Sequence, residues 1–180
     1  MHRLFIAIRP PEEVRRQLLA LMSGLPGLRW QNDNQLHLTL RFIGEVERPM
    51  AEDIAAELIR LCFPRFSIAL AGVGQFEKDR RGALWAGVKP TDQLKTLNAK
   101  VERICQSAGL AAERRTFYPH ITLARWKGRV AGIDSFIESH GGLASEPWQV
   151  GTLTLYESRL GRDGAHYEPV AEYALAAALT

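Results

Sequence analysis

The strongest constraint on the fold is a strand–helix–strand pattern that the chain contains twice. Residues 3–43 predict a buried strand, a helix that starts after paired prolines, and a strand that carries the sequence HLTL. Residues 83–125 predict the same order and end in a strand that carries HITL. The repeat predicts an α+β fold of two pseudo-symmetric lobes, with antiparallel or mixed sheets lining a central cleft and helices outside. No linker rich in Gly, Ser or Pro separates the two segments, so we expect one domain over residues 1–180.

Hydrophobic periodicity extends this prediction along the rest of the chain. Apolar residues at helical spacing predict further helices, and alternating runs bounded by turn residues predict further strands. The expected helices beyond the first cover residues 48–62, 91–109 and 131–139. The expected strands cover residues 3–9, 28–31, 36–43, 66–76, 83–89, 120–125, 148–158 and 166–176.

The composition of the chain excludes several classes of protein. No run of about 18 apolar residues occurs, and the short apolar start does not have the pattern of a signal peptide, so we expect no membrane attachment. Cys62 and Cys105 lie in apolar, helix-like sequence without a zinc-binding spacing, which predicts two buried thiols in a cytoplasmic protein. The net charge is +3, and 18 of the 23 basic residues are Arg. This bias suits phosphate binding, but it is equally typical of a GC-rich genome.

Two of the five histidines, His37 and His120, occur in the same setting, His-x-Thr-Leu. Because side chains alternate along a strand, each histidine shares a face with the threonine two residues later, about 7 Å away. The intervening apolar residues would anchor the opposite face in the core. If the two lobes face each other, the two imidazoles and the hydroxyls of Thr39 and Thr122 meet in one cleft.

A pair of imidazoles is suited to cleaving a phosphodiester. Imidazole titrates near neutral pH, so one ring can take a proton from the attacking oxygen while the other protonates the departing oxygen. The chain has no His-x-His or HExxH pattern for zinc and no G-x-S-x-G for a nucleophilic serine. We therefore expect no metal and no cofactor. The competing interpretation is that both histidines are ordinary core residues.

The chain resembles the two-histidine phosphoesterases, specifically the bacterial RNA 2′,3′-cyclic phosphodiesterases, also called 2′-5′ RNA ligase-like proteins. The resemblance rests on HLTLRFIGE (37–45) and PHITLAR (119–125). It is supported by RLFIAI near the start, LRW (28–30), LWAGV (84–88) and LYESRLGRDGAHYEPV (155–170), and so covers nearly the whole chain. It implies a bilobal α+β fold around a cleft, and metal-independent opening of a terminal 2′,3′-cyclic phosphate on RNA to leave a 2′-phosphate.

The resemblance also implies roles for individual residues. His37 would be the general acid for the leaving 3′ oxygen, and His120 the general base on water. Thr39 and Thr122 would hold the phosphate. One departure is that the chain reads RRTFYPH where such proteins often have Arg-Pro-x-x-Pro-His, so substrate contacts around residues 114–118 do not carry over.

Phe42 and Arg125 each lie five positions after a histidine, and the resemblance assigns them to the base and the phosphate. Strict alternation would instead turn both away from the histidines, unless a bulge redirects them. Core packing is therefore an equal alternative for Phe42. Arg41 has the parity of His37 and is a rival phosphate ligand. The weaker candidates are Arg159, Lys78, Arg80 and Arg81, whereas His2, His140 and His166 have no repeated setting and are expected to be structural or surface residues.

The expected partner is an RNA end or an oligonucleotide with a 2′,3′-cyclic phosphate, and we expect a monomer. The natural substrate is left open between a tRNA fragment, an oligonucleotide end and a small cyclic nucleotide. A first alternative is a module that binds RNA ends without turnover. A second is joining of RNA ends through a 2′-5′ bond, which would be the minor direction unless the second RNA hydroxyl is held in place.

Overall fold

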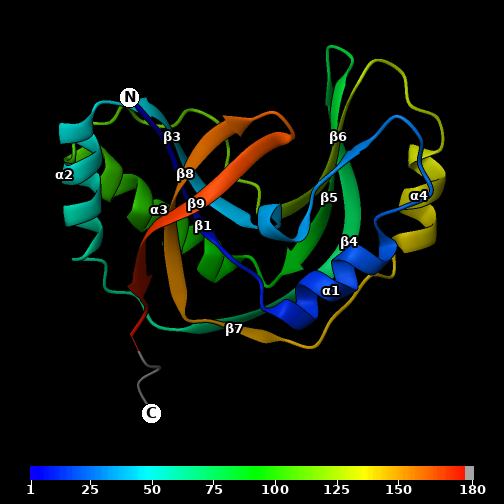
Figure 1. Ribbon diagram of the computed structural model, residues 1–180. Helices are drawn as coiled ribbons and strands as arrows, with labels where there is room; N and C mark the ends of the chain where they lie inside the picture. Colours follow the sequence, from blue (N-terminus) through cyan, green and yellow to red (C-terminus); the bar gives the residue numbers. More distant parts are fainter. Residues whose placement is uncertain (177–180) are drawn as a thin grey trace.

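One nine-stranded sheet runs through the protein, and four α-helices cover it (Figure 1). The computed structural model describes residues 1–176, so the last four residues of the expected domain lie outside the described residues. The strands are β1 (His2–Ile8), β2 (Arg29–Trp30), β3 (Leu38–Val46), β4 (Phe66–Lys78), β5 (Arg81–Lys89), β6 (His120–Lys127), β7 (Trp148–Val150), β8 (Thr152–Gly161) and β9 (Gly164–Ala174). The helices are α1 (Glu12–Leu21), α2 (Arg48–Leu58), α3 (Asp92–Ser107) and α4 (Ile133–His140), with a short 3-10 turn η1 (Asp33–Gln35).

The two strands that carry the histidine motifs lie side by side at the centre of the sheet. The strand order is β7-β4-β5-β6-β3-β1-β8-β9, and β2 pairs with β6. Strands β3 and β6 pair at one antiparallel position, where Leu38 lies opposite Ile121. The other pairs of neighbouring strands in the sheet are also antiparallel. The α+β class is confirmed. We call β3, β1, β8 and β9 lobe A, and β6, β5, β4, β7 and β2 lobe B.

The helix of each strand–helix–strand repeat covers the opposite lobe. Helices α2 and α3 lie against lobe A, whereas α1 and α4 lie against lobe B (Figure 1). The side chain of Asn98 on α3 donates a hydrogen bond to Leu40 O of β3, and Gln17 on α1 donates to Ala144 O, which is bridged to β4 through Ala71. The order of elements in both repeats is as predicted. However, a repeat does not form a lobe by itself, because its two strands lie in one lobe and its helix covers the other.

Apolar faces of the helices form the core that fixes the sheet. Val14 and Leu18 of α1 and Ile54 and Leu58 of α2 are buried. In α3 the buried residues are Leu94, Leu97, Val101 and Cys105. Burying each large apolar side chain contributes about 1.5–3 kcal/mol, so these helical faces hold the two lobes in register.

Two expectations from the sequence need correction. Cys62 is exposed rather than buried, because α2 ends at Leu58 and the cysteine lies in the loop that follows the turn at residues 59–60. The expected strand over residues 148–158 is two strands. The first, β7, pairs with β4 at the edge of lobe B, and the second, β8, pairs with β1 in lobe A, so the chain crosses from one lobe to the other at Gly151. Among residues 1–176, no helix is long and apolar enough to cross a membrane.

Candidate active site

A β-bulge occurs three residues after each of the two histidines. On β3, Thr39 pairs with Ala7 and Arg41 pairs with Ile6, so Leu40 is an extra residue. On β6 the register with β5 shifts in the same way, and the extra residue is Leu123. An extra residue resets the alternation of side chains. The residue five positions after each histidine therefore returns to the histidine's face.

The bulges decide the orientation that strict alternation left open. Phe42 is 47% exposed, and its ring lies 6.1 Å from that of Phe5, which in turn lies 4.8 Å from the His37 ring. Arg125 is also exposed, on the face of His120. Arg41 pairs with Ile6, the neighbour of the residue that pairs with Thr39, so it turns to the other face, and the expectation that it shares the face of His37 is wrong. Its side chain is only 8% exposed.

Each histidine is fixed by the same backbone contact. His37 Nδ1–H donates to Gln35 O at 2.6 Å, and His120 Nδ1–H donates to Tyr118 O at 2.6 Å. Because a carbonyl oxygen only accepts, Nδ1 must carry the hydrogen in both rings. The lone pair of each neutral ring is therefore on Nε2, the nitrogen that can exchange a proton with a substrate. The two rings are prepared in the same tautomer by residues two positions upstream.

The surroundings of both rings disfavour the imidazolium form. Burial lowers the pKa of His37 to about 4, opposed by the Gln35 hydrogen bond, and the charges of Arg125, His120 and Arg9 lower it further. Burial and Arg125 also lower the pKa of His120, opposed by the Tyr118 hydrogen bond. The effect of His120 on His37 means that a proton on one ring disfavours a proton on the other. More groups oppose the charged form at His37 than at His120.

Aromatic rings surround both histidines in a similar way. The Tyr167 ring meets His37 edge-on, with centroids 5.2 Å apart, and Phe76 meets His120 edge-on at 5.1 Å. Phe76 and Tyr118 are both exposed, and their rings lie 5.6 Å apart. Neither was identified from the sequence; for Phe76 the reason is that the register that brings β4 beside His120 is not visible there.

A cleft of about 450 Å³ opens between the lobes beside His120. Its lining includes four of the predicted residues that face it, namely Thr39, Thr122, Arg125 and Phe42, together with Arg41 at its wall. His37 is not part of this lining and stands between Phe5 and Tyr167. It is nevertheless within electrostatic reach of the cleft, since the charges of Arg125 and His120 lower its pKa.

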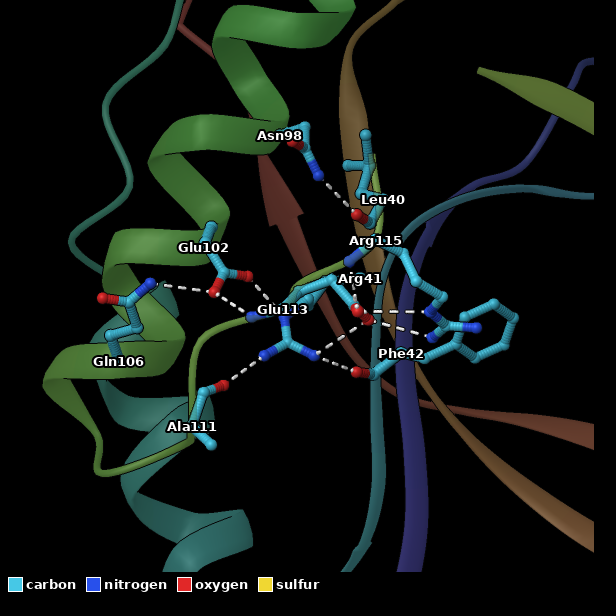
Figure 2. Close-up of polar contacts among 9 residues, drawn as sticks. All are labelled: Leu40, Arg41, Phe42, Asn98, Glu102, Gln106, Ala111, Glu113 and Arg115. Atoms are coloured by element: carbon cyan, nitrogen blue, oxygen red, sulfur yellow. Dashed lines mark hydrogen bonds and ion pairs between the residues drawn. The ribbon is translucent and has the colours of Figure 1, made fainter. Parts of the chain in front are cut away.

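Arg41 belongs to a network of charged side chains (Figure 2), and the members Arg41, Glu102, Glu113 and Arg115 line one wall of the cleft. Its guanidinium donates to Glu102 on α3 and to two backbone oxygens, Phe42 O and Ala111 O. Glu113, which accepts a bidentate contact from Arg115, lies 3.8 Å from Arg41, and its backbone N–H donates to Glu102. The network joins the β3 bulge to the segment before the second motif, which lines the cleft with Arg115, Thr116, Phe117 and Tyr118.

The remaining candidates lie away from this cleft. Arg159 is paired with Glu157 and Glu168, and Glu157 also accepts from His2 at 2.8 Å. His140 packs on Phe136 with ring centroids 4.3 Å apart, and His166 lies opposite Arg159. Lys78, Arg80 and Arg81 lie at the β4–β5 hairpin. Among residues 1–176, no group of three or more His, Cys, Asp or Glu side chains is arranged to hold a metal ion.

Comparison with known proteins agrees with the geometry of the two motifs. The family described as the 2′-5′ RNA ligase superfamily matches residues 7–162 of the chain. The chain belongs to this superfamily. It is 36% identical over 154 residues to the RNA 2′,3′-cyclic phosphodiesterase of Aeropyrum pernix, covering 83% of this chain and 87% of the relative. It is 31% identical over 180 residues to the enzyme of that name from Escherichia coli, covering 96% of each.

Solved structures of the superfamily share the whole fold. The crystal structure of Escherichia coli LigT in apo form matches with a TM-score of 0.80 and 29% identity, covering 97% of each chain. LigT complexed with 3′-AMP matches with a TM-score of 0.78 and 28% identity, covering 97% of this chain and 98% of that one. The resemblance inferred from the two motifs is confirmed.

Proposed function

We propose that this protein is an RNA 2′,3′-cyclic phosphodiesterase that opens a terminal cyclic phosphate to a 2′-phosphomonoester by two-histidine acid–base catalysis. The observation that carries the proposal is the pair of imidazoles, His37 directly before β3 and His120 at the start of β6, fixed in the same tautomer by equivalent 2.6 Å hydrogen bonds. The names of the relatives from Aeropyrum pernix and Escherichia coli support the substrate.

In the proposed reaction, water attacks the phosphorus while the bond to the 3′ oxygen breaks. Nε2 of His120 takes a proton from the water, and Nε2 of His37 gives a proton to the departing 3′ oxygen. The product is a 2′-phosphate with a free 3′ hydroxyl. One proton has moved from His37 to His120, and exchange with solvent restores the starting state.

The bound phosphate itself helps to load the acid. Burial and nearby cations lower the pKa of His37 to about 4. A phosphodiester brings a negative charge beside both rings, which raises the pKa of a nearby imidazole. The need for this charge is greatest at His37, where more groups oppose protonation. A ring with a low intrinsic pKa is also a strong proton donor once it is protonated.

The other predicted residues hold the substrate in this scheme. Thr39 and Thr122 donate their hydroxyls to the non-bridging phosphate oxygens, and the Arg125 guanidinium balances the charge of the phosphate. The exposed ring of Phe42 stacks on the base. Arg41 acts through the protein, because its donors are bound to Glu102 and to backbone oxygens, and it positions the bulge that turns Phe42 outward.

We also propose that the protein acts as a monomer on RNA ends in the cytoplasm. One chain supplies both histidines and both threonines. Its two cysteines are free thiols, as is usual in a reducing compartment. The same residues would catalyse the reverse reaction, joining two RNA ends through a 2′-5′ bond, when a second RNA hydroxyl occupies the position of water.

The test is incubation of the protein with a single-stranded RNA that ends in a 2′,3′-cyclic phosphate, in the presence of EDTA. We expect a 2′-phosphate product, and we expect His37→Ala and His120→Ala each to abolish turnover while His140→Ala retains it. Circular dichroism checks that all three variants are folded. Undiminished activity of either active-site variant would overturn the mechanism. Tight binding of the 2′-phosphorylated RNA without turnover at any pH would favour the binding module instead.

A further inference from the structure

Basic side chains from four strands form a continuous surface beside His120. Lys78 on β4 lies opposite Arg81 on β5, and Arg81 lies opposite Lys127 on β6. Nearer the histidine, Arg125 on β6 lies opposite Arg29 on β2. All five side chains are exposed. We call these five residues the basic track.

The basic track is on the same face of the sheet as the second histidine motif. Directly paired residues of neighbouring strands point to the same face, as do residues two apart along a strand. Because Leu123 is an extra residue, Lys127 and Arg125 share the face of Thr122 and His120. Lys127, with Arg81 and Lys78 opposite it in turn, lies about 7 Å along β6 from Arg125, which has Arg29 opposite it.

The surface along the basic track is recessed and continuous with the cleft. Arg125 lines the cleft and also two neighbouring hollows. One of them is lined by Phe76, Lys78 and Arg81 at the hairpin, and the other by Arg29, Arg81 and Lys127. A linear molecule could therefore extend from His120 onto lobe B without leaving the surface.

The arrangement of the charges is unfavourable for the protein alone. Like charges directly opposite each other across a sheet are destabilising. The basic track contains three such pairs, and no ion pair involving its members occurs among residues 1–176. Two acids, Glu77 and Asp79, also line the hollow at the hairpin and offset part of its charge, but Glu77 lies opposite Gly82 rather than opposite a basic residue, and Asp79 is in the turn. The charge of the basic track is thus available to an anionic partner.

We infer that the basic track binds the phosphates of the RNA strand on the 5′ side of the cyclic phosphate, so that the protein prefers an RNA end to a cyclic mononucleotide. The inference rests on the proposed function and specifies its substrate class. A mononucleotide reaches the histidines but leaves the basic track empty. A longer strand releases counterions from its phosphates as it contacts the basic track, which makes its binding dependent on salt.

The experiment compares two substrates, adenosine 2′,3′-cyclic phosphate and a short oligoadenylate that ends in a 2′,3′-cyclic phosphate. The track variant, Lys78→Gln/Arg81→Gln/Lys127→Gln, removes the three basic residues that lie opposite one another across β4, β5 and β6, and it keeps Arg125. The matched control, Arg48→Gln/Arg60→Gln/Lys95→Gln, removes the same charge from exposed positions on α2, in the turn after α2 and on α3. Values of kcat/KM are measured for all three proteins at low and at moderate salt.

The wild-type protein and the control are expected to prefer the oligoadenylate at low salt, and the track variant to lose this preference while retaining activity on the mononucleotide. Raising the salt from about 50 to about 200 mM should lower the wild-type efficiency on the oligoadenylate about 20-fold more than that of the variant, as expected for three contacts with a slope of about 0.7 each. The variant should unfold at an equal or higher temperature, because opposed charges are removed. Equal salt dependence of the track variant and the wild type would overturn the inference that the basic track binds RNA phosphates. Absence of turnover on both substrates by the wild type would instead overturn the proposed function.

Discussion

The low pKa of His37 predicts that the protein loses stability in mild acid. The pKa of this ring is about 4 in the folded protein, against an ordinary value of 6.5. Between these values the unfolded chain binds a proton that the folded protein excludes, so the free energy of unfolding falls as the pH falls. The loss begins near pH 6.5 and is complete below about pH 4.

The magnitude follows from the difference between the two pKa values. One pKa unit corresponds to about 1.4 kcal/mol, so His37 alone accounts for a loss of about 3 kcal/mol over the whole range and about 2 kcal/mol by pH 5. His120 contributes in the same direction, since its pKa is also lowered. A protein of this size has a total stability of about 5–15 kcal/mol, so the effect is large enough to measure.

The assay is urea unfolding, followed by tryptophan fluorescence, at about pH 7.5 and about pH 5. The variant His37→Gln lacks the titrating ring and should lose about 2 kcal/mol less than the wild type between these pH values. His166→Gln, an exchange of an exposed histidine on β9, is the control and should follow the wild type. Inorganic phosphate added at pH 5 should restore part of the wild-type stability, because the anion favours the charged rings. An equal loss in His37→Gln and wild type would refute the electrostatic account of the site.

Two further predictions concern the residues that support the site. Glu102→Gln should lower the free energy of unfolding by about 2–4 kcal/mol and raise the KM for RNA, because the buried Arg41 loses its closest carboxylate and the β3 bulge loses its support; urea unfolding and steady-state kinetics measure the two effects. Gly74→Ala should cost about 1–3 kcal/mol and reduce kcat/KM, because the added Cβ overlaps the Trp85 ring beside His120. Gly142→Ala, where no atom lies within 4 Å of the added Cβ, is the control and should change stability by less than about 0.5 kcal/mol.

The sequence was sufficient to predict the order of elements and the two histidine strands. The pattern of His37 and His120 with their threonines depends only on alternation along a single segment. Both threonines lie on the central strands β3 and β6, with His120 at the start of β6 and His37 directly before β3. The expected lobes were also correct in number. The lobe that each helix covers could not be predicted, because nothing within a repeat indicates that its helix crosses to the other half.

The orientation of Phe42, Arg41 and Arg125 could not be predicted from one strand. A bulge is a property of two strands, since it exists only where the partner lacks a matching residue. Leu40 and Leu123 look like any other apolar residues in the sequence. The roles of Phe76 and the basic track depend in the same way on the register between β4, β5 and β6.

The crossing of the helices has a consequence for the order in which activity arises during synthesis. Lobe A contains β1 and β3 from the first repeat, but it is completed by α3 and by β8 and β9, and both of these strands follow the two histidine motifs along the chain. The His37 ring also packs against Tyr167 on β9. A nascent chain that already contains both histidines therefore still lacks part of the packing around its first one. Competence to act on RNA should arise only after the ribosome has released β9, which keeps incomplete chains inactive.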